Sequence, residues 1–108
     1  MIEEVELKSG QKLFISQYGC AHFGLSYKFE VAADFNENLI SAAKRYLKLV
    51  GSFAPTFSES LGNKMDEIPN NFPTPELIPL EPGYDWIYLA TENEGDVGYF
   101  IITYDVAL

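Results

Sequence analysis

The sequence is poor in the residues that small proteins use for covalent cross-links and metal sites. Cys20 is the only cysteine among 108 residues, and His22 is the only histidine. A single cysteine excludes an internal disulfide and any zinc site built from several cysteines. No apolar run approaches the ~20 residues that a membrane-spanning helix needs, and the first residues lack the basic and apolar regions of a signal peptide. We therefore expect a cytoplasmic protein that does not enter a membrane.

Basic residues are absent from the last part of the chain. All seven Lys and Arg residues lie within residues 1–64, where seven acidic residues balance them. Residues 65–108 contain nine Asp and Glu, so the whole net charge of −9 belongs to that part. Such a charge repels nucleic acid and anionic membranes and attracts cationic proteins. Acidic residues also serve simply to keep a small bacterial-type domain dissolved.

No motif of a known enzyme class or cofactor site occurs in the sequence, which lacks a Gly-rich phosphate loop, GxSxG and HExxH. Cys20 and His22 would point to the same side of a strand, within reach of a thiolate–imidazolium pair, but no orienting group accompanies them. The acidic residues of 92–96 resemble part of a calcium loop without its remaining ligands. We predict a protein that is not an enzyme and holds no metal or cofactor; a small enzyme or ligand-binding domain using Cys20 and His22 is an alternative.

The clearest structural pattern is a β-hairpin over residues 85–107, where two segments rich in β-branched and aromatic residues flank a polar turn. A two-residue loop at 94–95 would pair Leu89 with Phe100. The residues predicted to share a core face are Ile87, Leu89, Phe100 and Ile102. Those predicted to share the opposite face are Trp86, Tyr88, Tyr99, Ile101 and Thr103.

Two more strand patterns precede this hairpin. Apolar residues alternate with polar ones in the first 15 residues, and a three-residue loop at 8–10 would pair Val5 with Leu13 and Glu6 with Lys12. A strict period of two then runs through residues 25–33, which predicts a half-buried strand. The residues on its predicted buried face are Leu25, Tyr27, Phe29 and Val31.

One main helix and a Pro-rich segment are predicted between the strands. The helix has an apolar stripe at helical spacing, and either a capping box of Asp34 and Glu37 or Asn36 as N-cap would begin it. Residues 52–84 contain all six prolines, and we expect them to form an extended strap along the sheet with at most a helical turn or two. The predicted stripe consists of Leu39, Ala43, Tyr46, Leu47 and Val50.

These segments predict a single α+β domain over residues 1–108. Strands in runs with one helix between them favour an antiparallel sheet of about five strands, with the main helix packed on one face. The predicted order is β-β-β-α-strap-β-β.

Acidic and aromatic residues coincide in the last quarter of the chain, a combination typical of protein-binding surfaces. Rings would anchor the complex, and carboxylates would speed association with a basic partner. The leading hypothesis is a non-enzymatic binding module, similar in character to immunity or inhibitor proteins that neutralise basic nuclease toxins. One alternative is a structural or assembly domain of phage or mobile-element type that oligomerises, for example as a homodimer, through its aromatic face. The predicted partner-binding residues are Asp85, Trp86, Tyr88, Glu92, Glu94, Asp96 and Tyr99.

Overall fold

The computed structural model describes residues 2–6, 11–18, 22–51, 55–80 and 85–107. The chain divides into two compact units, which we describe separately. The sheet unit comprises Met1–Phe35 and Glu76–Leu108, and the helical unit comprises Asn36–Pro75. The prediction of a single domain stays a prediction.

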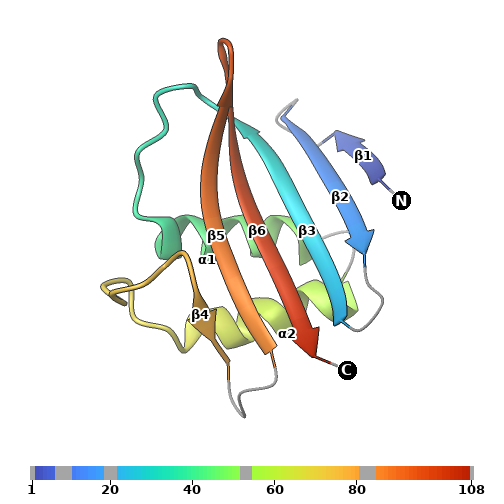
Figure 1. The fold of residues 1–108 in the computed structure, drawn as a ribbon, viewed down its shortest axis with the longest axis vertical. Helices are drawn as coiled ribbons and strands as arrows, with labels where there is room; N and C mark the ends of the chain where they lie inside the picture. The colour runs from blue at the N-terminus through green and yellow to red at the C-terminus, as the bar shows by residue number, and fades with distance from the viewer. Residues whose placement is uncertain (1, 7–10, 19–21, 52–54, 81–84, 108) are drawn as a thin grey trace. The chain divides into compact units, whose positions relative to one another are not determined.

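The sheet unit contains an antiparallel sheet with the strand order β1-β2-β3-β6-β5-β4 (Figure 1). Five strands agree with the prediction, and a sixth of only two residues lies in the Pro-rich segment. The α+β class is therefore confirmed. The strands are β1 (Ile2–Glu6), β2 (Lys12–Tyr18), β3 (His22–Val31), β4 (Ile78–Pro79), β5 (Asp85–Glu94) and β6 (Val97–Ala107).

One face of the sheet is buried, because apolar residues alternate along β2, β3, β5 and β6. Phe29 of β3 lies opposite Phe100 of β6, and the ring of Phe35 stacks on Phe100 with centroids 5.5 Å apart. Val31, predicted to be buried, is half-exposed. The buried apolar residues of these strands are Leu13, Leu25, Tyr27, Phe29, Ile87, Leu89, Phe100 and Ile102.

The β5–β6 hairpin turns at 95–96 and not at 94–95, so Leu89 lies opposite Ile102 and not opposite Phe100. Gly95 has a φ of 65°, and a type II′ turn needs a positive φ at this first loop position, which glycine adopts at little cost. The predicted register was therefore wrong by two residues. Because side chains alternate with a period of two, the predicted faces remain correct.

The β1–β2 hairpin has the predicted register, with Val5 opposite Leu13 and Glu6 opposite Lys12. The predicted loop at 8–10 lies outside the described residues.

The end of the Pro-rich segment forms the edge of the sheet next to β5. Ile78 lies opposite Ile87, and the N–H of Leu80 donates a hydrogen bond to the carbonyl oxygen of Asp85 at 3.0 Å. Proline has no N–H to donate, so Pro79 is compatible with an edge strand.

The helical unit contains α1 (Leu39–Gly51) and α2 (Pro55–Asp66). Helix α2 is longer than the turn or two expected in the Pro-rich segment. Pro55 is its first residue, where a missing N–H costs nothing. The side chain of Val50, from the predicted stripe, lies outside the described part, and Leu39 is half-exposed. The buried residues of the two helices include Ile40, Ala42, Ala43, Tyr46, Leu47, Leu61 and Met65.

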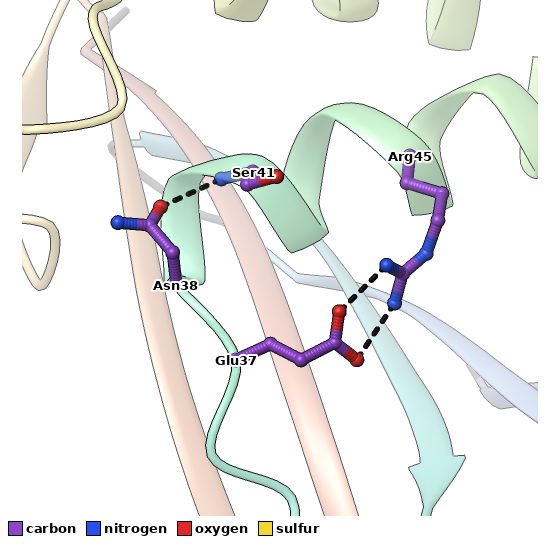
Figure 2. Close-up of polar contacts among 4 residues, drawn as sticks. All are labelled: Glu37, Asn38, Ser41 and Arg45. Atoms are coloured by element: carbon purple, nitrogen blue, oxygen red, sulfur yellow. Dashed lines mark hydrogen bonds and ion pairs between the residues drawn. The ribbon is translucent and has the colours of Figure 1, made fainter.

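Helix α1 is capped by Asn38, whose Oδ1 accepts a hydrogen bond from the N–H of Ser41 at 2.9 Å (Figure 2). Both predicted caps were wrong. Asp34 lies in a turn closed by the hydrogen bond from the N–H of Phe35 to the oxygen of Ala32. The Glu37 carboxylate accepts two hydrogen bonds from Arg45, at 2.6 and 2.9 Å (Figure 2), and these lower the pKa of Glu37.

Replacing Gly98 by alanine should destabilise the fold. A Cβ atom at Gly98 would lie 2.6 Å from the carbonyl oxygen of Ala32, and overpacking of this kind costs about 1–3 kcal/mol. Gly62 in α2 is the control, because its nearest contact would be an ordinary 3.8 Å to Leu47 Cβ. Urea unfolding should show a loss for Gly98→Ala and a gain of about 0.5–1 kcal/mol for Gly62→Ala. Equal effects would contradict the close approach.

Replacing the cap residue should also lower the free energy of unfolding. Asn38→Ala removes the acceptor for the Ser41 N–H, which should cost about 1 kcal/mol. Asn36→Ala is the matched control, since Asn36 lies just before this cap and is exposed. If Asn36→Ala were the more damaging substitution in thermal unfolding, the assignment of the cap would be wrong.

Candidate functional site

The second face of the sheet, which we call the outer face, carries aromatic residues that are half-exposed. They alternate with the buried residues along β2, β3, β5 and β6, as the period of a strand requires. The half-exposed residues of the outer face include Phe14, Ser16, Ser26, Lys28, Trp86, Tyr88, Tyr99, Ile101 and Thr103.

Strand pairing brings residues from four strands together on this face. Lys28 of β3 lies between Phe14 of β2 and Ile101 of β6. Tyr99 of β6 lies opposite Glu92 of β5, and the rings of Phe14 and Tyr99 meet edge to face with centroids 6.4 Å apart. This part of the outer face is therefore apolar and aromatic, with the Lys28 side chain among the rings.

The Lys28 ammonium is held by a ring and two carboxylates. Its Nζ lies 4.3 Å from the centroid of Tyr99, 3.5 Å from Glu94 Oε1 and 3.8 Å from Glu92 Oε1. The Lys28 side chain is 30% exposed, and the glutamates are 46% and 57% exposed. An exposed ion pair contributes about 0–1 kcal/mol, and a cation–ring contact at such a site about 0.5–1 kcal/mol. The ammonium is therefore held in place only weakly.

A hollow of about 350 Å³ opens on the outer face beside this cluster. The hydroxyl oxygen of Ser26, which lines the hollow, lies 3.4 Å from that of Thr103. The lining of the hollow combines apolar, hydroxyl and charged side chains. Its lining consists of the apolar Phe14, Tyr99 and Ile101, the hydroxyls of Ser16 and Ser26, and the Lys28–Glu94 pair.

The structure places most of the predicted partner-binding residues on one face of the sheet, with Glu92 opposite Tyr99 and with Tyr88 and Trp86 farther along β5, opposite Thr103 and Asp105. Trp86, Tyr88 and Tyr99 are half-exposed on the outer face, and none is sealed in the interior. Glu92 and Glu94 are exposed on the same face of β5, and Asp96 is exposed in the adjoining turn. The sequence interpretation missed Lys28 and Phe14 as site residues, although the period-two pattern already placed both opposite the buried face.

Asp85 does not belong to this surface. It shares the buried face with Ile87 and Leu89 and is only 5% exposed. Tyr104 donates a hydrogen bond from its hydroxyl to Asp85 Oδ2 at 2.8 Å. Burial and this charged acceptor raise the pKa of Tyr104 to about 12. The prediction was wrong for this residue, because neighbours in a strand point to opposite faces and Asp85 precedes Trp86.

The net charge of the chain resides entirely in the sheet unit. This unit contains three Lys and twelve Asp or Glu, which gives −9, whereas the helical unit contains four basic and four acidic residues and is neutral. Acidic residues from the beginning of the chain and from its last part therefore lie in the same unit. A charge of one sign on one unit steers cationic molecules toward it.

The structure adds little to the alternative of a catalytic or ligand-binding site at Cys20 and His22. Cys20 lies outside the described residues, and for His22 only the backbone in β3 is described. Within the described ranges, no group of three or more His, Cys, Asp or Glu residues is placed to hold a metal ion. Neither of the two described helices is long and apolar enough to span a membrane.

The stability of the protein should fall at high pH through Tyr104. Its pKa of about 12 in the folded protein exceeds the usual value of about 10, so its stabilising contribution is complete below pH 10 and is lost as the pH rises toward 12. Urea unfolding of Tyr104→Phe and of the unaltered protein at pH 8 and pH 11 should show that their difference in stability shrinks. Tyr88→Phe is the matched control on the outer face. A difference that is equal at both pH values would contradict the prediction.

Comparison with known proteins does not assign a function to this surface. No protein family, curated protein or solved structure matches the chain. The outer face and the charge of the sheet unit are the features of the protein that bear on its function.

Proposed function

We propose that the protein is a non-enzymatic binding module whose outer face docks a basic protein. The observation that supports this proposal most strongly is the position of half-exposed aromatic residues and exposed carboxylates on one face of a unit with a net charge of −9. An inhibitor of the immunity type, occupying the cationic cleft of a toxin, is the finer form of the proposal.

The aromatic residues suit the role of anchors. Trp86, Tyr88 and Tyr99 come from two adjacent strands and are all half-exposed. Trp and Tyr are enriched among the residues that dominate binding energy, since they bury a large area at a small loss of conformational entropy. A rigid sheet holds these rings in place before the partner arrives, which lowers the entropic cost of binding further.

The charge favours a cationic partner over a second copy of the chain. Two sheet units face to face would bring two charges of −9 together, and like charges across an interface oppose association. A basic protein would instead be attracted and would associate faster. The alternative of oligomerisation through the aromatic face is therefore less well supported.

Photo-crosslinking in cells can identify the partner. A photoreactive amino acid in place of Tyr88 lies on the outer face, and one in place of Leu49, which is 45% exposed on α1, is the matched control. We expect one protein with a basic isoelectric point to be captured from position 88 and not from position 49. An acidic partner, or equal capture from both positions, would contradict the proposal.

Charge reversal should slow association with the purified partner. Glu92→Lys, Glu94→Lys and Asp96→Lys together should lower the association rate constant about tenfold or more at low salt, and the loss should shrink with added salt. The control with the same change of charge is Asp66→Lys, Glu67→Lys and Glu76→Lys, at three other exposed acids. Stopped-flow rates for the first variant that stay within about twofold and independent of salt would refute the electrostatic role.

A further inference from the structure

We infer that the hollow on the outer face receives one arginine side chain of the partner, at the position that the Lys28 ammonium now occupies. The inference rests on the proposed function and adds the chemical group that the surface recognises. Lys28 is then an internal competitor for that position and does not anchor the partner.

The position is one where a cation is already bound. Lys28 Nζ lies over the Tyr99 ring at 4.3 Å and within 3.8 Å of one oxygen from each of Glu92 and Glu94. The ring and both carboxylates come from the β5–β6 hairpin, whereas Lys28 comes from β3. The cation-binding groups would therefore stay in place if the Lys28 side chain turned away.

A guanidinium group satisfies these groups better than an ammonium does. It is planar, so it stacks on an aromatic ring, and its N–H groups form a fork that can bond to two carboxylates at once. The ammonium of Lys28 reaches the two glutamates at 3.5 and 3.8 Å, longer than the 2.7–2.9 Å typical of charge-assisted hydrogen bonds. A guanidinium group that forms hydrogen bonds of the typical length would therefore bind these glutamates more strongly than Lys28 does.

The size and the lining of the hollow suit a long basic side chain. Its volume of about 350 Å³ is at the small end of the range for ligand pockets. Phe14 and Ile101 form apolar walls beside the Lys28–Glu94 pair, and the methylene stem of an arginine packs well on apolar side chains while its head stays charged.

An anionic ligand fits the same place poorly. Lys28 is the single cation in the lining of the hollow, and two glutamates lie beside it. The sheet unit around it carries a charge of −9, which opposes the approach of an anion. The surroundings thus select for positive charge even though a lysine lies at the centre.

Removing Lys28 should open the position to arginine. The probe is the peptide acetyl-Gly-Arg-Gly-amide, titrated against the full chain while the amide NMR signals of Tyr99 and Ile101 are followed. Lys28→Met should lower the dissociation constant at least about tenfold relative to the unaltered protein, because the internal competitor is gone. Lys28→Gln, which keeps a polar side chain, should act in the same direction and covers the case in which Lys28→Met does not fold.

Three controls make the result specific. The peptide with citrulline in place of arginine has nearly the same shape without the charge and should bind at least tenfold more weakly to Lys28→Met. Adding Tyr99→Leu to Lys28→Met should weaken binding of the arginine peptide about two- to fivefold relative to Lys28→Met, since the ring contact is lost. The peptide acetyl-Gly-Glu-Gly-amide should not bind to any variant.

Equal affinity of the unaltered protein and both Lys28 variants for the arginine peptide would overturn the inference. Equal binding of the citrulline peptide, or binding of the glutamate peptide through Lys28, would overturn it as well. These titrations report on the hollow alone, whereas crosslinking and association rates report on the whole outer face. A failed peptide titration beside a captured basic partner would therefore refute the arginine position and leave the proposed function standing.

Discussion

The hydrogen-bond register between β3, β6 and β5 decides which side chains share a face, and the candidate site depends on it. This register places Lys28 beside Ile101 and Tyr99 opposite Glu92, although Lys28 and Glu94 are separated by 66 positions in the chain. A slip by one residue would exchange the two faces of a strand. The same alternation that buries Phe29 and Phe100 therefore presents the aromatic residues of the outer face.

The distribution of charge determines which unit of the protein attracts a cationic partner. The sheet unit holds the entire net charge and the helical unit is neutral, so attraction of a cationic partner would be strongest at the sheet. Glu92 and Glu94, near the tip of the β5–β6 hairpin, lie beside the Tyr99 ring, so early encounter and later anchoring can use the same region. Lys28 moderates the negative charge at the centre and keeps the ring of Tyr99 covered until a stronger cation arrives.

Much of the sheet could be predicted from the period of two, because burial of one face leaves a direct trace in the sequence. The burial of Leu25, Tyr27 and Phe29 in β3 followed from it, whereas Val31 at the end of the strand is half-exposed. The exact turn of the last hairpin did not follow from this period, since it depends on the positive φ of Gly95. The length of α2 is not evident from the proline content of residues 52–84, because Pro55 occupies the first helical position, where proline is favourable.

Part of the candidate site was also predictable, because side chains alternate between the two faces along a strand. Trp86, Tyr88 and Tyr99 share a face because of local alternation, which a sequence shows directly. The same alternation places Asp85 on the face opposite Trp86, where it accepts a hydrogen bond from Tyr104 and is not part of the candidate site. The contact of Lys28 with Tyr99 and two glutamates depends on which strands are neighbours in the sheet, and alternation within one strand does not reveal that order.

The most direct measurement of the central claim is a map of the amide NMR shifts that the purified partner causes in the full chain. The account predicts that the largest changes fall at the outer-face positions of β2, β3, β5 and β6, with Tyr88, Tyr99 and Ile101 among them, while the amides of α1 and α2 change little. Changes that concentrate in the two helices and leave those strands unaffected would contradict it.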